Sequence, residues 1–332
     1  MHSPSSLNLR LIGGDIVRTI LSMRECVDLM ERAMTTISTG ATEMPLRTVL
    51  PLPGANMAGV MMGYLGDPES LGAKLLSIYP GNPDRGLPSH TGVVILFDLS
   101  DGRPCALLDA AELTSLRTPA ASAAATRALA RSDAGDLAIL GAGEQAKGHL
   151  EAMAIARPLR RVRLWGRNRQ KAEAFARENA SLSPVAIEIC EDVEAAVKGA
   201  DIICTTTGSN EPILRGAWLS PGTHVNLVGA GVRSAREADA AAVLRGRYFV
   251  DYRVSAMAQA GELLHAFEDE RGAADHIAAE IGEVFAGKRP GRTGPDDITV
   301  YKSLGNAAQD LAASHAIYQK AEAQGLGTAV RF

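Results

Sequence analysis

The sequence predicts an α/β protein, in which a doubly wound parallel sheet is joined to a second α+β domain built from both chain ends. Apolar runs alternate with helical patterns from about residue 126 to 304. Before this region, several apolar runs follow one another without long crossover helices. The 332 residues are enough for about two domains. We therefore expect one domain at 1–125 with 305–332, and the parallel-sheet domain at 126–304.

The N-terminal region predicts a helix followed by strands. After a short extended start, apolar residues recur at helical spacing from Cys26 to Ile37, which indicates an amphipathic helix packed on a sheet. Four apolar runs separated by proline and glycine clusters predict strands, and residues 80–88 predict a loop. These runs lie at residues 49–52, 59–62, 73–79 and 93–97. The expected sheet is mostly antiparallel or mixed.

Two helices are predicted on either side of the central region. Residues 110–130 are rich in alanine, and we expect the helix to begin near Arg117, Thr118 and Pro119, because proline is tolerated in a first helical turn. Residues 304–324 form a helical pattern with small residues on one face, and residues 325–332 predict a strand that returns to the first sheet.

The central region predicts the parallel sheet through regular alternation of strands and helices. Expected strands lie at residues 137–140, 162–165, 187–190, 201–205, 224–228 and 248–251. Expected helices lie between them, at residues 144–156, 171–178 and 193–198. Strands that alternate with helices in this way form a parallel, doubly wound sheet.

A glycine-rich turn follows the first of these strands and has the GxGxxA spacing of a dinucleotide-binding Rossmann unit. Gly141 permits the tight turn, Gly143 lets the backbone approach a pyrophosphate, and Ala146 lets helix and strand pack closely. The helix then directs unpaired N–H groups at the phosphates. Such turns also join strands to helices for structural reasons alone. The predicted cofactor-binding residues here are Gly141, Ala142, Gly143, Glu144 and Gln145.

The end of the second strand indicates which dinucleotide binds. The sequence there is Arg167-Asn168-Arg169, without the acidic residue that accepts the ribose hydroxyl of NAD. Arginines are suitable donors for a 2′-phosphate, so NADPH is favoured, with NADH as the alternative. The alternative is that these arginines belong to a solvent-exposed basic turn without a role in binding. After a later strand, the hydroxyls of Thr205, Thr206 and Thr207 can serve the ribose or nicotinamide, or simply form a turn.

Composition excludes several classes of function. A net charge of −4 provides no electrostatic footprint for nucleic acid or an anionic membrane. The four cysteines and seven histidines lack metal-ligand spacing, so we expect no metal site and reduced thiols. We find neither a signal-peptide pattern nor an apolar run long enough to span a membrane. A cytoplasmic protein is therefore expected.

Four segments together resemble the ornithine cyclodeaminase/μ-crystallin family. They are LTSLRTPAASA (113–123), GAGEQAKGHLEAM (141–153), THVNLVGAG (223–231) and TVYKSLGNAAQDLA (299–312), and the likeness covers nearly the whole chain in order. The resemblance implies a homodimer, in which the domain built from both chain ends binds substrate and forms the dimer. It also implies that the active site lies in the cleft between that domain and the Rossmann domain.

The resemblance assigns site residues by position. Arg47, Lys74 and Arg117 match the positions that face a small amino or imino acid substrate. Their chemistry suits an α-carboxylate, since an arginine can form a forked pair and a lysine supplies a point charge. Lys74 also interrupts an apolar strand and would need a partner if buried. The same resemblance adds Val228, Gly229 and Ser303 to the predicted cofactor-binding residues.

Two departures separate the branches of this family. Gly231 occupies the position of the catalytic aspartate in members that deaminate ornithine, and Met61-Met62 lies where those members carry an acidic residue. The segment 228–239, with Arg236, Glu237 and Asp239, resembles instead the ketimine-reductase and μ-crystallin branch. That branch implies reduction, with NAD(P)H, of a cyclic ketimine carboxylate such as Δ1-pyrroline-2-carboxylate or Δ1-piperideine-2-carboxylate to the cyclic L-amino acid.

Lys74 is then the residue that we expect to control the proton of the imine, because burial beside two arginines would lower its pKa toward neutrality. Three alternatives remain. The first is an ornithine cyclodeaminase-like lyase, and the second is an alanine dehydrogenase or opine-type enzyme that reduces an acyclic imine. The third is a protein that binds NADPH and a small ligand without turnover.

Overall fold

The computed structural model describes residues 8–331, which fold into two compact units. The first unit contains residues 8–117 and 306–331, and the second contains residues 118–305. The chain leaves the first unit within helix α3 (Ala110–Leu129) and re-enters it directly before helix α12 (Ala307–Gln324). Both chain ends therefore belong to the same unit.

The first unit is built on one mixed sheet with the strand order β16-β1-β7-β6-β5-β4-β2, and β3 pairs with β4 beside it. All neighbouring strands are antiparallel except β1 and β7. Strand β16 returns to pair with β1, as the sequence predicts. Its elements are β1 (Asn8–Ile12), α1 (Gly14–Ile20), α2 (Met23–Thr39), β2 (Thr42–Glu43), β3 (Thr48–Pro51), β4 (Met57–Gly66), β5 (Glu69–Ile78), β6 (His90–Phe97), β7 (Pro104–Asp109), α12 and β16 (Thr328–Arg331).

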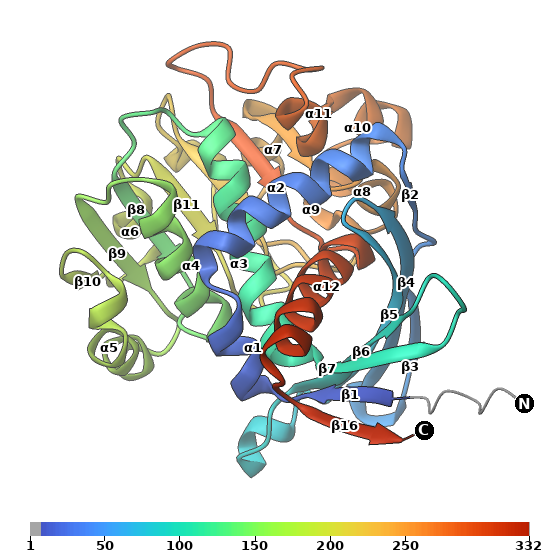
Figure 1. Ribbon diagram of the computed structural model, residues 1–332. Coiled ribbons are helices and arrows are strands. Elements are labelled where there is room, and N and C mark those ends of the chain that lie inside the picture. The colour runs from blue at the N-terminus through green and yellow to red at the C-terminus, as the bar shows by residue number, and fades with distance from the viewer. Residues whose placement is uncertain (1–7, 332) are drawn as a thin grey trace, which may run out of the picture. The chain divides into compact units, whose positions relative to one another are not determined.

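Helices α12 and α2 cover one face of this sheet. Figure 1 shows α12 (red) lying across strands β4, β5 and β6, with α2 (blue) beside it. Helix α2 begins at a capping box between Ser22 and Glu25 and ends at Gly40, which adopts the left-handed conformation. The predicted helical stripe is confirmed, because all its members are buried: Cys26, Val27, Met30, Ala33, Met34 and Ile37.

Helix α3 corrects one prediction. We expected it to begin near Arg117, but it begins at Ala110, and Pro119 lies inside it. The start is set by Asp109, whose carboxylate accepts the backbone N–H of Glu112 at 2.9 Å and so satisfies one of the free donors of the first turn. Pro119 has no N–H to donate, and the helix continues through it at the expense of one backbone hydrogen bond.

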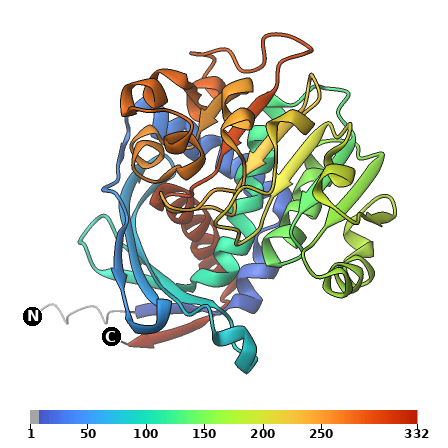
Figure 2. The ribbon, with the colours of Figure 1, turned by 180° about the vertical axis from the view of Figure 1, so that it is seen from behind.

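The second unit is a parallel sheet with the strand order β10-β9-β8-β11-β12-β15-β13-β14, and all its neighbouring strands are parallel. The doubly wound sheet is thus confirmed. Figure 2 shows its yellow strands β11 and β12 side by side. The strands are β8 (Asp136–Leu140), β9 (Arg161–Trp165), β10 (Ile187–Ile189), β11 (Ile202–Thr205), β12 (His224–Leu227), β13 (Arg247–Val250), β14 (Ile277–Glu280) and β15 (Thr299–Lys302).

The sequence predicts six of these strands but not β14 and β15. Helix α4 has the predicted bounds, and α5 and α6 differ by one or two residues. The helices besides α3 are α4 (Glu144–Ala156), α5 (Arg169–Glu178), α6 (Val193–Val197), α7 (Ala240–Arg245), α8 (Arg253–Gln259), α9 (Gly261–His265), α10 (Glu270–His276) and α11 (Ile281–Phe285).

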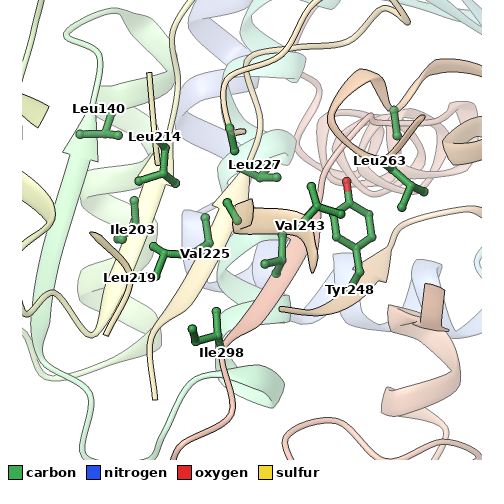
Figure 3. Packing of buried hydrophobic residues seen from close by; sticks show 14 of the residues in the cluster. Leu140, Ile203, Leu214, Leu219, Val225, Leu227, Val243, Tyr248, Leu263 and Ile298 are labelled. Atoms are coloured by element: carbon green, nitrogen blue, oxygen red, sulfur yellow. The ribbon is translucent and has the colours of Figure 1, made fainter. Parts of the chain in front are cut away.

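Apolar side chains on one face of this sheet form its core. Figure 3 shows Leu140 from β8, Ile203 from β11 and Val225 from β12 along that face, packed with residues of the connecting segments such as Leu214 and Val243. The strand register places these strand residues on a common face of the sheet. Between residues 8 and 331, no helix has both the length and the apolar content to cross a membrane.

Candidate functional site

The glycine-rich turn lies where the strand order reverses between β8 and β11. Gly141 has φ of +120°, and a Cβ there would be 2.7 Å from the carbonyl oxygen of Thr206, so only glycine fits. Gly143 precedes α4, and a Cβ built on it would meet no described atom within 4 Å. Open space therefore lies at the N-terminus of a 13-residue helix. Free backbone N–H groups at such an end suit the pyrophosphate of a dinucleotide.

The residues after β9 differ in whether their side chains already have partners within the protein. Asn168 caps α5, with its side-chain oxygen accepting the N–H of Lys171 at 3.0 Å. Arg169 donates its Nε to Glu173 at 2.9 Å. Arg167 is exposed and makes no ion pair among the described residues. Of the two arginines, Arg167 is thus the one without a competing carboxylate.

The three threonines at the end of β11 and directly after it donate their hydroxyl protons to the protein itself. Thr205 and Thr207 each donate to the carboxylate of Glu237 at 2.7 Å, and Thr206 donates to the carbonyl of Leu140 at 3.1 Å. What they offer a ligand is therefore backbone groups and oxygen lone pairs. Val228 and Gly229 follow β12, and Ser303 follows β15 with a buried Oγ that has no hydrogen-bond partner in the described chain.

In the first unit, a buried charge cluster contains two of the three predicted substrate residues. The Lys74 Nζ lies 2.7 Å from Oδ2 of Asp310, and the Arg117 Nε donates to Oδ1 of the same carboxylate at 2.9 Å. Arg117 also donates Nη1 to the side-chain oxygen of Gln309 at 3.0 Å. The residues Lys74, Arg117, Gln309 and Asp310, which we call the Lys74 cluster, are all at most 4% exposed.

Three elements bring the Lys74 cluster together. Lys74 lies in the middle of β5, Arg117 on α3, and both Gln309 and Asp310 on α12. The sequence predicts that a buried Lys74 needs a partner but does not identify Asp310. A signal was present, because Gln309 and Asp310 are polar residues in an otherwise small and apolar helical segment that the family resemblance had already marked. In Arg117, Nη2 makes no hydrogen bond to the described residues.

The electrostatics of the Lys74 cluster leave an excess of positive charge. Burial lowers the pKa of Lys74 to about 8, with Arg117 and Arg47 adding to the shift and Asp310 opposing it. Burial alone would raise the pKa of Asp310, but Arg117 and Lys74 outweigh it and hold that pKa below its ordinary value. Arg47 is half-buried on the segment between β2 and β3. One carboxylate thus faces two buried cations and a third nearby.

The positions that distinguish a deaminase carry no carboxylate. Met61 is buried on β4 directly opposite Lys74 in the strand register, while Met62 points away and is 51% exposed. Gly231 follows β12 without a side chain. Within residues 8–331, no group of three or more histidine, cysteine, aspartate or glutamate side chains is arranged to hold a metal ion.

Comparison with known proteins points to one family. The model of the ornithine cyclodeaminase/mu-crystallin family matches residues 14–325. The ketimine reductase mu-crystallin of Mus musculus is 38% identical over 280 residues, which cover 84% of this chain and 85% of the relative. The solved structure of the Thermococcus litoralis Delta(1)-pyrroline-2-carboxylate reductase, in complex with NADH and L-proline, is 33% identical with a TM-score of 0.92, and the match covers 97% of this chain and 100% of that chain. An archaeal alanine dehydrogenase dimer with bound NAD is 29% identical with a TM-score of 0.92, covering 98% and 99% of the two chains.

Proposed function

Because the chain belongs to the ornithine cyclodeaminase/mu-crystallin family, we propose that it reduces a small cyclic ketimine carboxylate with NAD(P)H. The substrate is Δ1-pyrroline-2-carboxylate or Δ1-piperideine-2-carboxylate, and the product is the cyclic L-amino acid. Relatives described as a ketimine reductase and as a Delta(1)-pyrroline-2-carboxylate reductase support this reaction. The cofactor, when bound, supplies the hydride that the imine carbon receives.

The observation that carries the proposal is the positive excess of the Lys74 cluster. Buried charge is tolerated when it is paired and hydrogen-bonded, and here Asp310 balances only one of the two buried cations. A substrate carboxylate would balance the second. Arg117 has Nη2 available for it beside the two bonds that fix its guanidinium plane. Arg47 adds a further charge close enough to influence Lys74.

Lys74 holds the proton on which imine reduction depends. An imine carbon accepts hydride well only when its nitrogen is protonated. With a pKa of about 8, Lys74 is mostly protonated at neutral pH yet releases its proton readily. Its ammonium can therefore keep the imine nitrogen protonated, directly or through a water, while Arg117 holds the carboxylate. This division of roles needs no second carboxylate, which fits Gly231 and Met61 at the positions described above.

The second unit is proposed to hold the cofactor. The open space at Gly143, the free N–H groups of α4 and the backbone of residues 205–207 and 228–229 support binding of a dinucleotide. Arg167 has no carboxylate partner among the described residues and is a suitable donor for a 2′-phosphate, which favours NADPH. The relatives solved with NADH and with NAD make NADH the alternative to test.

A homodimer is proposed through the outer face of the first sheet. The strand register puts Val60, Leu75 and Val93 side by side on the face opposite Lys74, and all three are at least 40% exposed. An exposed apolar sheet face of this kind is typical of an interface. The archaeal alanine dehydrogenase is described as a dimer, which supports a dimeric state. The further exposed apolar residues on β3 and β4 are Val49, Leu50 and Met62.

We also propose that the protein acts in the cytoplasm. All four cysteines are free, and Cys26 and Cys204 are buried. Burial raises the pKa of each of these two thiols to about 12, which keeps them unreactive. Free thiols are typical of a reducing compartment. Fractionation of cells with an antibody against the chain tests the location.

Initial rates of NADPH and NADH oxidation test the reaction. We expect turnover with the cyclic ketimines, slower turnover with mixtures of a 2-oxo acid and an amine, and no proline or ammonia from ornithine with catalytic NAD+. Replacing Arg117 with alanine removes a buried charged contact, which costs about 2–5 kcal/mol, so kcat/KM should fall at least about tenfold.

Each alternative has its own result in this assay. Proline and ammonia from ornithine would identify a lyase, and faster reduction of acyclic imines would identify the dehydrogenase or opine-type enzyme. Tight cofactor binding without any turnover would identify a binding protein. Unchanged kinetics of Arg117→Ala on cyclic ketimines would contradict the role of the Lys74 cluster.

A further inference from the structure

Three loops at the carboxyl ends of β8, β11 and β12 are in direct contact. Gly141, in the first loop, packs so closely on Thr206 that a Cβ would come within 2.7 Å of it. Gly229, in the third loop, packs on Thr207, whose carbonyl oxygen would be 2.0 Å from a Cβ. The backbone of residues 205–207 therefore lies between the glycine-rich turn and the loop after β12. A displacement of one loop must displace its neighbours.

The carboxylate of Glu237 ties two of these loops together from the inside. This side chain is fully buried on the segment before α7 and accepts four hydrogen bonds. Oε1 accepts the backbone N–H and the hydroxyl of Thr207, each at 2.7 Å. Oε2 accepts the hydroxyl of Thr205 at 2.7 Å and the backbone N–H of Gly229 at 2.6 Å. The loop after β11 and the loop after β12 are thus both bound to the carboxylate of Glu237.

Only a carboxylate can make this set of bonds. Each oxygen of Glu237 receives one backbone N–H, from Thr207 on one side and from Gly229 on the other. A threonine hydroxyl can rotate and accept a bond, but a backbone N–H can only donate. A glutamine at this position has one NH2 group, which would face a backbone N–H in either orientation of the amide. Replacement by glutamine must therefore open one loop or the other.

A second carboxylate and a lysine hold Glu237 and the loop after β12 in place. The backbone N–H of Glu237 donates to Oε1 of Glu262 at 3.1 Å. Lys302, fully buried at the end of β15, lies 3.0 Å from Oε2 of Glu262 and donates to the carbonyl of Ala230 at 2.6 Å. Gly229 is consequently hydrogen-bonded to Glu237, and Ala230 to Lys302. We call Glu237, Glu262 and Lys302 the Lys302 cluster.

We propose that Glu237 is a positioning residue of the cofactor site, which sets the spacing of the loops after β11 and β12 without touching the cofactor. The proposal rests on the proposed binding of NAD(P)H to this edge of the sheet. In an open parallel sheet, ligands bind at the carboxyl ends of the strands where the order reverses, and here that edge is formed by the three loops in contact. Their backbone spacing therefore determines how well a dinucleotide fits.

The experiment compares three purified variants with the wild-type protein. Glu237→Gln breaks the set of acceptors, and Glu237→Asp keeps both oxygens on a shorter side chain. Glu211→Gln is the matched control, because the Glu211 side chain is 79% exposed and, within residues 8–331, forms an ion pair with Arg236 alone. Direct titration of NADPH and NADH by fluorescence gives the dissociation constants without any substrate. Steady-state rates then give KM for cofactor and for imine separately, and thermal unfolding shows that each variant is folded.

We expect Glu237→Gln to weaken cofactor binding at least about tenfold, with Glu237→Asp between it and the wild type and Glu211→Gln unchanged. KM for the imine, and kcat at saturating cofactor, should change by less than about threefold, which a general loss of structure would not produce. If Glu237→Gln does not fold, Glu237→Asp and Thr207→Val, which each weaken the same set of bonds, must show the loss.

Two results would overturn the proposal in distinguishable ways. Folded Glu237→Gln that binds both cofactors as tightly as the wild type would refute the positioning role while leaving the proposed function intact. A wild-type protein that binds neither cofactor in the titration would refute the proposed function and the positioning role with it. Equal losses in cofactor binding, imine KM and kcat would also count against positioning, since they would indicate a purely structural role.

Discussion

The two units each bury a charge cluster, and the two clusters are opposite in sign. In the first unit, Lys74 and Arg117 share the single carboxylate of Asp310. In the second unit, the single ammonium of Lys302 pairs with Glu262, which also accepts the backbone N–H of Glu237, so the carboxylate of Glu237 is the one in excess. Both are nearly inaccessible to solvent, so burial alone does not tell them apart.

What separates the clusters is how the excess charge is satisfied. The excess carboxylate of Glu237 accepts four hydrogen bonds, two of them from backbone N–H groups that belong to the fold itself. The excess cation of the Lys74 cluster has no matching set of acceptors, because Arg117 reaches only Asp310 and Gln309 within the described chain. A buried charge whose hydrogen bonds are all supplied by the fold has a structural role. A buried charge without such partners indicates a binding site for a ligand of opposite charge.

The largest effect is expected from Lys74→Met. Removing the group that we propose to control the imine proton should lower kcat/KM about 10²–10⁴-fold, the usual contribution of general acid–base catalysis. Unfolding stability should change less, because Asp310 keeps Arg117 as a partner. Steady-state rates with a cyclic ketimine and urea denaturation measure the two quantities. Lys288→Met, at an exposed position, is the control. Full activity of Lys74→Met would mean that the cluster does not handle the proton.

Lys302→Met tests the structural role of the Lys302 cluster in the second unit. It leaves Glu262 buried without its cation and frees the carbonyl of Ala230, and breaking a buried pair in this way costs about 3–5 kcal/mol of unfolding free energy. Urea denaturation beside Lys74→Met gives the difference directly. We expect Lys302→Met to be the less stable of the two. Equal stabilities would show that the sign and satisfaction of the excess charge do not distinguish the clusters.

The sequence predicted the fold better than the clusters, for a physical reason. Periodicity reveals which face of an element is buried, so the helix from Cys26 to Ile37 and the parallel strands are confirmed. The start of α3 was wrong because a proline signal outweighed the cap at Asp109. Partners of buried charges are distant in sequence: Asp310 lies on α12 and Lys74 on β5. No local pattern records such a pairing, which arises only when the elements pack.

Asp310→Asn tests whether the pKa of Lys74 sets the pH dependence of the rate. Asp310 raises the pKa of Lys74 against the lowering by burial and by the two arginines, so its neutralisation should move that pKa further below 8. In the proposed role Lys74 acts as the ammonium, which is lost as pH rises through its pKa. The wild-type rate should therefore fall above about pH 8, and the falling limb of the variant should lie at lower pH. Each unit of displacement reduces the protonated fraction about tenfold once the pH exceeds the pKa.

The measurement is kcat/KM between pH 6 and 10 with a cyclic ketimine. Asp15→Asn, at an exposed position in the first turn of α1, is the matched control and should keep the wild-type profile. A limb that moves to higher pH, or does not move, would show that another group than Lys74 sets the profile.

The smallest effect tests whether the same rule holds at the surface. Arg169 already pairs with Glu173, whereas Arg167 has no carboxylate partner among the described residues. If an unpaired charge indicates a ligand, Arg167→Ala should raise KM for NADPH about tenfold, because one charge-assisted hydrogen bond is lost. KM for NADH should not change. Arg169→Ala is the matched control and should affect NADPH less. Initial rates with both cofactors measure the ratio. A larger loss in Arg169→Ala would confine the rule to buried clusters, because solvent and salt would then compensate the charge of Arg167 without help from a phosphate.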